Sequence, residues 1–227
     1  FAGEVKKITT LPVFHAARIP DVATARHAVA KGLLDMVGMT RAHMADPHIV
    51  RKISEGREND IRPCVGATYC LDRIYQAGEA LCMHNAATGR ELSMPHDIKP
   101  ALKRKNIVIV GAGPGGLEAA RVSAERGHKV TVLEAQPNPG GQVRLTARNP
   151  RRKEMISIID WRMSQCAARD VVCYFNAYAT AEDVIKLRPD VVYSSALQRA
   201  LRSAVAAYPN HEIIAEPNLR EVGADDG

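Results

Sequence analysis

The feature that most constrains the fold is a glycine triplet directly after a short apolar segment. The segment "NIVIV" begins at Asn106, and Gly111, Gly113 and Gly116 follow it in the spacing G-x-G-x-x-G, with Glu134 ending the next apolar segment. This order predicts a strand, a tight turn, a helix and a second strand, with a pyrophosphate at the helix N-terminus. Gly111 permits the turn, Gly113 lets the backbone approach the phosphates, and Gly116 lets helix and strand pack closely.

The acidic residue at the end of the second strand narrows the choice of nucleotide. Glu134 can accept hydrogen bonds from a ribose hydroxyl, and its charge repels a 2′-phosphate, so FAD, NAD or ADP is favoured over NADP. The loop "PNPGGQ" follows Glu134 and by itself indicates only a turn. The alternative is a glycine-rich turn without a ligand. The predicted cofactor-binding residues are Gly111, Gly113, Gly115, Gly116, Glu134, Gly141 and Gln142.

Composition excludes several classes of protein. The chain has 227 residues, 46% of them hydrophobic, and a net charge of +6, so it can bury one or two ordinary cores. With 4% aromatic residues, none of them interleaved with the basic clusters at 103–105 and 148–153, solvated linker charge is favoured over a nucleic-acid surface. No run of about 18 apolar residues predicts a membrane span. Five cysteines argue against a disulfide framework and favour a reducing cytoplasm.

The first 60 residues predict two strand–helix units. Strands are expected within 11–19 and 33–40, and helices within 21–32 and 45–56. Such units form parallel strands, and a sheet of two strands does not stand alone, so the rest of this domain is expected upstream. Residues 61–104 predict an irregular cysteine loop and linker, and residues 105–192 a Rossmann-like domain.

Three cysteines lie in the segment "RPCVGATYCLDRIYQAGEALC". Cys70 stands six residues after Cys64, Cys82 twelve after Cys70, and Ala67 lies halfway between the first two. Thiolates are the usual ligands of iron–sulfur clusters. Zinc would also accept them, but would need a fourth ligand such as His84 or Asp72. Ordinary loop cysteines are the third reading.

The motifs together resemble one family. "DMVGMTRAHMADPHIVRK", the cysteine loop, "VIVGAGPGGLEAA" and "LEAQPNPGGQ" occur in the order seen in the iron–sulfur flavoproteins related to trimethylamine dehydrogenase and 2,4-dienoyl-CoA reductase. These are Old Yellow Enzyme-like NADH:flavin oxidoreductases with an N-terminal barrel. The linker is most similar to that of the N-methylproline demethylase type, and the resemblance covers roughly residues 1–192.

The resemblance implies a fold and an FMN site. Residues 1–60 would be the last two βα units of a (β/α)8 barrel, whose loops after strands seven and eight hold phosphate. The matching positions are Ala17, Arg18, Thr40 and Arg41, with Ala17 and Thr40 where the family often has glycine. Without the resemblance, surface salt bridges are the better account of the two arginines.

The resemblance also implies a role for the cysteines. Cys64, Cys70 and Cys82 match the first, third and fourth cluster ligands, and Ala67 occupies the second position. Three readings remain open: a [4Fe–4S] cluster with one non-cysteine ligand, a three-iron cluster, or a lost cluster.

The segment 193–227 departs from the family pattern. "YSSALQRA" and "LRE" resemble parts of a histidine phosphatase, but the Arg-His-Gly triplet that such an enzyme needs is absent from the sequence. This tail therefore does not predict a complete phosphatase site, and a fusion carrying such a segment is an alternative.

The fold expected is α/β: the end of a (β/α)8 barrel, a cysteine-containing linker and an incomplete Rossmann-like FAD/NAD-binding domain. The function expected is that of a fragment, inactive alone, of a flavin oxidoreductase. It would oxidise an amine or reduce an enoyl substrate at FMN and relay electrons through a cluster to or from a dinucleotide. Catalytic residues would lie in the missing N-terminal barrel. Partners would be a small-molecule substrate, that barrel and a possible homo-oligomer, without nucleic acid or membrane. A nucleotide-binding module without redox activity is the rival.

Overall fold

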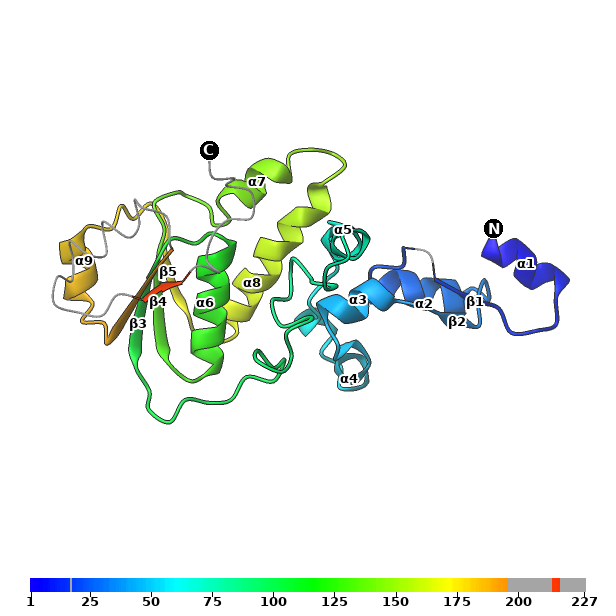
Figure 1. Cartoon of the computed structure of the whole chain (residues 1–227), viewed down its shortest axis with the longest axis horizontal. Coiled ribbons are helices and arrows are strands. Elements are labelled where there is room, and N and C mark those ends of the chain that lie inside the picture. The colour runs from blue at the N-terminus through cyan, green and yellow to red at the C-terminus, as the bar shows by residue number, and fades with distance from the viewer. Residues whose placement is uncertain (17, 196–213, 217–227) are drawn as a thin grey trace. The chain divides into compact units, whose positions relative to one another are not determined.

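The computed structural model describes residues 1–16, 18–195 and 214–216, and of residues 192–195 and 214–216 only the backbone. The chain divides into two compact units, residues 1–96 and residues 97–227. Most of their helices and strands are labelled in Figure 1.

The first unit contains the two predicted strand–helix units. Strands β1 (Phe14–His15) and β2 (Met36–Val37) pair in parallel, with Phe14 opposite Met36. Helix α2 (Val22–Ala30) connects them; it begins after Asp21, whose carboxylate accepts the Thr24 N–H at 2.7 Å. The remaining helices before the cysteine loop are α1 (Ala2–Ile8), α3 (Thr40–Ala45) and α4 (Ile49–Ser54).

Several elements of this unit are shorter than the sequence predicts. Each strand has two residues, because among the described residues β1 and β2 pair only with each other. The helix expected within 45–56 begins only at Ile49, after the separate helix α3. Pro47 explains the break, since a residue before proline avoids helical geometry, and Asp46 has φ −142° and ψ 100°.

The cysteine loop is more ordered than predicted. A 3₁₀ turn, η1 (Glu58–Asp60), precedes it, and helix α5 (Tyr69–Tyr75) lies inside it, which corrects the expectation of irregular structure over 61–104. Helix α5 has no buried residue. Although Leu71, Ile74 and Tyr75 recur at helical spacing, seven residues are too short a window for that period to identify a helix in the sequence.

The second unit is a parallel sheet of the Rossmann-like kind that the glycine triplet predicts. Its strand order is β5-β4-β3-β6-β7. The strands are β3 (Asn106–Val110), β4 (Lys129–Leu133), β5 (Val172–Tyr174), β6 (Val191–Ser195) and β7 (Ile214–Glu216). The helices are α6 (Pro114–Glu125), α7 (Gln142–Thr146), α8 (Ser157–Ala167) and α9 (Ala181–Lys186), with a 3₁₀ turn η2 (Lys153–Ile156) before α8.

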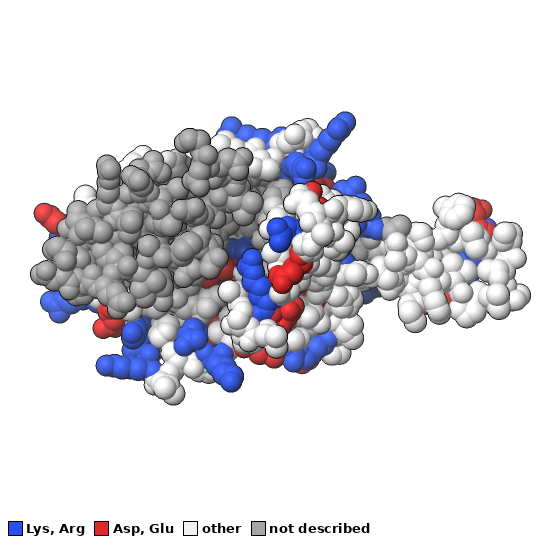
Figure 2. All heavy atoms as spheres, in the orientation of Figure 1, with Lys and Arg blue, Asp and Glu red and all other residues white. Residues whose placement is uncertain are grey.

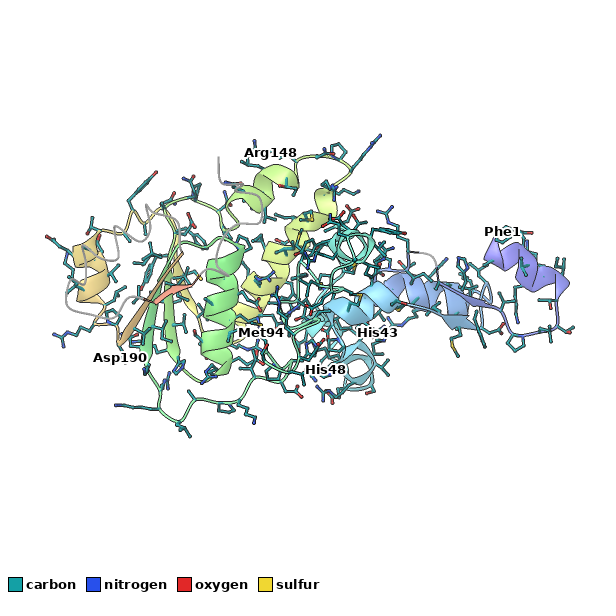
Figure 3. All side chains as sticks on the ribbon, viewed as in Figure 1. Phe1, His43, His48, Met94, Arg148 and Asp190 are labelled. Carbon is teal, nitrogen blue, oxygen red and sulfur yellow. The ribbon has the colours of Figure 1, made fainter. Side chains whose placement is uncertain are left out.

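The two faces of this sheet are covered by different helices. Val108 packs with Val184 of α9 on one face. Ile107 and Ile109 alternate with Val108 along β3 and so point to the other face, where α6 and α8 lie side by side (Figure 1). The Asn106 N–H donates to the carboxylate of Asp190, labelled in Figure 3, at 2.8 Å, which aligns the start of β3 with that of β6.

The segment 193–227 begins within this sheet. Strand β6 runs across the expected boundary between residues 192 and 193, with Tyr193 opposite Ile109 in parallel register. Strand β7 pairs with β6 at the edge. The described backbone of the tail therefore extends the Rossmann-like sheet. Most of "YSSALQRA" and all of "LRE" lie outside the described residues.

The described surface carries both signs of charge. Figure 2 shows Lys and Arg side chains interspersed with Asp and Glu on the face in view. Within the described ranges, no helix is long and apolar enough to cross a membrane.

Candidate functional site

The first glycine loop connects β3 to α6 in the way its sequence requires. Gly111 has φ +103°, a left-handed conformation, and its N–H donates to Leu133 O of β4 at 2.7 Å. A Cβ on Gly116 would lie 2.0 Å from the Gly111 carbonyl oxygen, so only glycine fits there. Pro114 opens helix α6 after Gly113, and Gly115 lies in its first turn.

Glu134 lies directly against this loop. One oxygen of its carboxylate accepts the Ala112 N–H at 2.6 Å, and the other accepts the Gln136 N–H at 2.8 Å. Because β3 and β4 are adjacent parallel strands, their carboxyl ends bring the acidic residue to the glycine loop. Each carboxylate oxygen keeps a further lone pair with which to accept a ribose hydroxyl.

The second glycine loop joins the first one. The Gly140 N–H donates to Ala112 O at 2.8 Å, and both Gly140 and Gly141 have positive φ, at +117° and +50°. Helix α7 then begins at Gln142. The sequence indicated only a turn here, and the contact with Ala112 is what brings Gly141 and Gln142 to the predicted site.

These three segments form a cradle suited to a dinucleotide. Helix α6 presents its N-terminal N–H groups beyond Gly113, where a Cβ would meet no atom within 4 Å. Pyrophosphate needs that combination of open space, unsatisfied N–H groups and a positive dipole end. Binding by the individual residues stays a prediction.

The two loops expected to hold FMN phosphate lie at the same end of the small sheet. The Gly38 N–H donates to His15 O at 2.8 Å, and a Cβ on Gly38 would stand 2.6 Å from the Ala16 Cβ. The residues after β1 and β2 are therefore neighbours. Arg18 and Thr40 are exposed and Arg41 is partly buried on α3, whereas Ala17 lies outside the described residues.

The three clustered cysteines line one pocket in the first unit. Cys64, Cys70 and Cys82 are free thiols and partly buried. The pocket holds about 380 Å³ of empty space, part of it open to solvent. Its lining consists of Arg41, Met44, Cys64, Val65, Gly66, Ala67, Thr68, Tyr69, Cys70, Cys82, Met83 and His84. The structure thus brings together the cysteines that the sequence separates, with Ala67 among them.

The backbone of this loop bends sharply beside the pocket. Gly66 has φ +64°, and Thr68, which precedes α5, has φ +61°. A β-branched residue seldom adopts this conformation, and such strain is found mainly at functional sites.

The end of α3 holds both arms of the cysteine loop, that is, the segment that leads into Cys64 and the segment that follows Cys82. The sequence did not predict these contacts. The buried Asp46 carboxylate accepts the Arg62 N–H at 2.8 Å and pairs with Lys52 at 2.5 Å. Asn85 Nδ2 donates to Ala45 O at 3.0 Å and Thr88 Oγ1 to Met44 O at 2.5 Å. One arm is fixed just before Cys64 and the other just after Cys82. The one sequence signal for this junction was the Asp46-Pro47 pair, which marks the end of α3.

The sulfur of Cys82 is largely buried and accepts backbone hydrogen bonds. Burial raises the pKa of its thiol, and backbone N–H groups of Asn85 and His84 that donate to the sulfur partly oppose this. The nearby Cys64 sulfur raises the same pKa further, and Arg62 lowers it. Hydrogen bonds to cysteine sulfur are among the features that tune iron–sulfur clusters.

The arrangement does not suit a single metal ion. Across the described part of the chain, no three His, Cys, Asp or Glu side chains are grouped closely enough to hold one. Asp72, suggested as a zinc ligand, is exposed, bonds Gln76 at 3.1 Å and does not line the pocket. In a cubane cluster each thiolate binds a different iron, so its ligands need not converge on one point.

Known proteins resemble this chain in the Rossmann-like unit and over its whole length. Residues 109–165 match the family of NAD(P)-binding Rossmann-like domains. The chain is 62% identical to a probable N-methylproline demethylase of Rhizobium meliloti, over 100% of this chain and 32% of that protein. It is 51% identical to a multifunctional alkene reductase/demethylase of Caballeronia cordobensis, over 84% of this chain and 28% of that protein.

Among solved structures, the 6-hydroxypseudooxynicotine amine oxidase of Pseudomonas geniculata N1 superposes with a TM-score of 0.81. It is 31% identical and covers 85% of this chain and 30% of its own. The chain spans about a third of the length of the curated relatives it matches.

The second unit is therefore a Rossmann-like dinucleotide-binding fold, and the relatives of the chain are named as demethylases and reductases. The resemblance that its motifs indicated is confirmed: the chain is similar to demethylases, alkene reductases and amine dehydrogenases of this kind. The match to the Rhizobium protein runs through the whole chain, and nothing in the comparisons supports the histidine-phosphatase resemblance of the tail. Nor do they favour a module without redox activity.

Proposed function

We propose that the protein containing this chain is a multicofactor flavin oxidoreductase that demethylates an N-methylated amino acid such as N-methylproline. The observation that carries the proposal is the pocket in which three free cysteines meet Arg41 of the helix expected to hold FMN phosphate. The identity of 62% to a probable N-methylproline demethylase supports the choice of substrate.

The cysteine pocket fits an iron–sulfur cluster at three ligand positions. Cys64, Cys70 and Cys82 supply thiolates, and the amides at Cys82 stabilise negative charge on sulfur. Arg41 adds a positive charge to the lining. A bound cluster supplies one-electron transfer, and a flavin supplies hydride and electron exchange.

We infer two further cofactor sites from the positions of the loops. Ala17, Arg18, Thr40 and Arg41 would hold the FMN phosphate at the carboxyl ends of β1 and β2. The glycine loops and Glu134 would hold FAD, or NAD or ADP at the same place.

The substrate pocket and the catalytic residues are assigned to the rest of the barrel. Phe14 and Met36, on β1 and β2, are 63% and 56% exposed, which fits strands that are covered by further barrel elements. A homo-oligomer and a cytoplasmic location stay predictions.

Anaerobic turnover tests this function. Demethylation removes two electrons from the N-methyl group, and water converts the resulting iminium to formaldehyde and the secondary amine. We expect N-methylproline to bleach the flavin of the purified protein and to release one formaldehyde for each pair of electrons taken up. Bleaching by NADH, followed by return of the flavin colour when a cinnamate-type alkene takes the two electrons, without any reaction with the amine, would instead assign alkene reduction, an activity that the name of the Caballeronia relative also includes. Inertness to both substrates would refute the proposal.

A further inference from the structure

The cysteine pocket contains a histidine with the features of a metal ligand. His84 follows Cys82 by two residues, is 1% exposed and contributes to the lining. Its own backbone N–H donates to the Cys82 sulfur. His84 is thus the one histidine of the pocket lining, and it lies beside the sulfur of Cys82, a predicted cluster ligand.

The orientation of the imidazole ring fixes its tautomer. Nδ1 lies 2.9 Å from Pro63 O, and because a carbonyl oxygen only accepts, Nδ1 carries the proton. In the neutral ring Nε2 then carries the lone pair. Metal-binding histidines typically donate their other ring N–H to a carbonyl or carboxylate in this way.

The acceptor belongs to the same loop. Pro63 directly precedes Cys64, so the Nδ1 contact connects the arm carrying Cys64 to the arm carrying Cys82. A ring held from both arms is preorganised, which favours ligation over a swinging side chain.

The sequence leaves one iron of a four-iron cluster without a thiolate. Ala67 lines the pocket between Cys64 and Cys70 and offers no ligand atom. The carboxylate of Asp72 points away, since α5 exposes it and Gln76 binds it.

We propose that His84 Nε2 is the fourth ligand of a [4Fe–4S] cluster held by Cys64, Cys70 and Cys82. The Nε2 lone pair forms the bond to iron, and no proton leaves the ring because Nδ1–H stays on the Pro63 carbonyl. This inference rests on the proposed function, and it adds that the cluster is complete despite Ala67.

Pulsed EPR of the dithionite-reduced protein tests the ligand directly. We expect about four irons per chain and a nitrogen hyperfine coupling that changes when histidine alone carries ¹⁵N, which separates the ring from backbone amides. In His84→Ala the iron should fall to about three per chain and the coupling should vanish.

Three further variants separate ligation from a structural role. His84→Cys should keep about four irons but lose the nitrogen coupling, because a thiolate replaces the ring. Ala67→Cys should also keep about four irons and lose the nitrogen coupling, because the new thiolate displaces the His84 ring from the iron. His96→Ala is the matched control: His96 contacts Asn85 in the same unit at 3.4 Å but does not line the pocket, so iron and coupling should be unchanged.

Four irons without a histidine coupling in the wild type would overturn the proposal. So would three irons in both the wild type and His84→Ala. Protein without iron would overturn this inference together with the cluster itself, whereas formaldehyde release from N-methylproline reports separately on the demethylase activity.

Discussion

The carboxylate of Asp46 accepts the backbone N–H of Arg62 at 2.8 Å and so ties the end of α3 to the segment that enters the cysteine pocket. Asp46 is 3% exposed and Arg62 stands two residues before Cys64. The helix carrying Arg41 and the loop carrying the thiols are therefore held as one piece, which links the expected FMN and cluster sites.

Replacing this carboxylate should loosen the pocket. Asp46→Ala removes the carboxylate that accepts from the Arg62 N–H and pairs with Lys52, which then keeps only the Asp60 carbonyl, at a cost of about 3 kcal/mol in the free energy of unfolding. We expect lower iron content per chain, measured after anaerobic purification, and a lower denaturant midpoint. Asp72→Ala is the control and should retain iron, since that side chain is exposed. Equal iron loss in both variants would contradict this role of Asp46.

Two glycines of the first loop should respond differently to the same added methyl group. Gly116→Ala places Cβ 2.0 Å from Gly111 O and should destabilise the second unit by about 3 kcal/mol. Gly113→Ala meets no atom within 4 Å and should cost about 1 kcal/mol or less, yet lower ADP affinity at least about tenfold by blocking the pyrophosphate. Thermal unfolding and calorimetric titration with ADP measure both. Unchanged ADP affinity in Gly113→Ala would show that the phosphates do not bind at this loop.

Glu134 should set the preference between nucleotides. Glu134→Ala removes a charged acceptor for ribose and the partner of the Ala112 and Gln136 N–H groups, so ADP should bind about 10-fold more weakly or worse. Discrimination against 2′-phospho-ADP should shrink because the repelling charge is gone. Titrations with the two nucleotides measure the ratio, with Glu182→Ala on α9 as control. A ratio unaffected by Glu134→Ala would contradict this assignment.

The buried thiol of Cys166 should make the fold sensitive to alkali. Burial raises the pKa of this thiol from its ordinary value of 9.0 to about 12. Between these values the unfolded chain has lost a proton that the folded chain keeps, so the free energy of unfolding should fall as the pH rises through that window. Urea unfolding at several pH values measures the slope. Cys166→Ala should flatten it, and an equal slope in wild type and variant would show that another group is responsible.

The sequence predicts the second unit better than the first for a physical reason. Gly111, Gly116 and Glu134 each meet a local requirement of one strand–turn–helix unit, so their spacing alone specifies the β3–α6–β4 fold. The contact between Gly140 and Ala112 depends on tertiary packing and is invisible in the spacing. In the first unit, Asp46 and Asn85 act through backbone partners 16 and 40 residues away, and no local pattern marks such pairs. Helix α5 escaped prediction because it spans only seven residues, which is too short a window for the helical period of Leu71, Ile74 and Tyr75 to be decisive.

The measurement that tests the account most directly is the content of iron, acid-labile sulfide and flavin per chain after anaerobic purification. We expect iron and sulfide in equal amounts, about four of each, together with bound flavin. Bound FAD or ADP without iron or sulfide would contradict it. That result would leave the glycine loops as a nucleotide site and reduce Cys64, Cys70 and Cys82 to ordinary thiols of a surface loop.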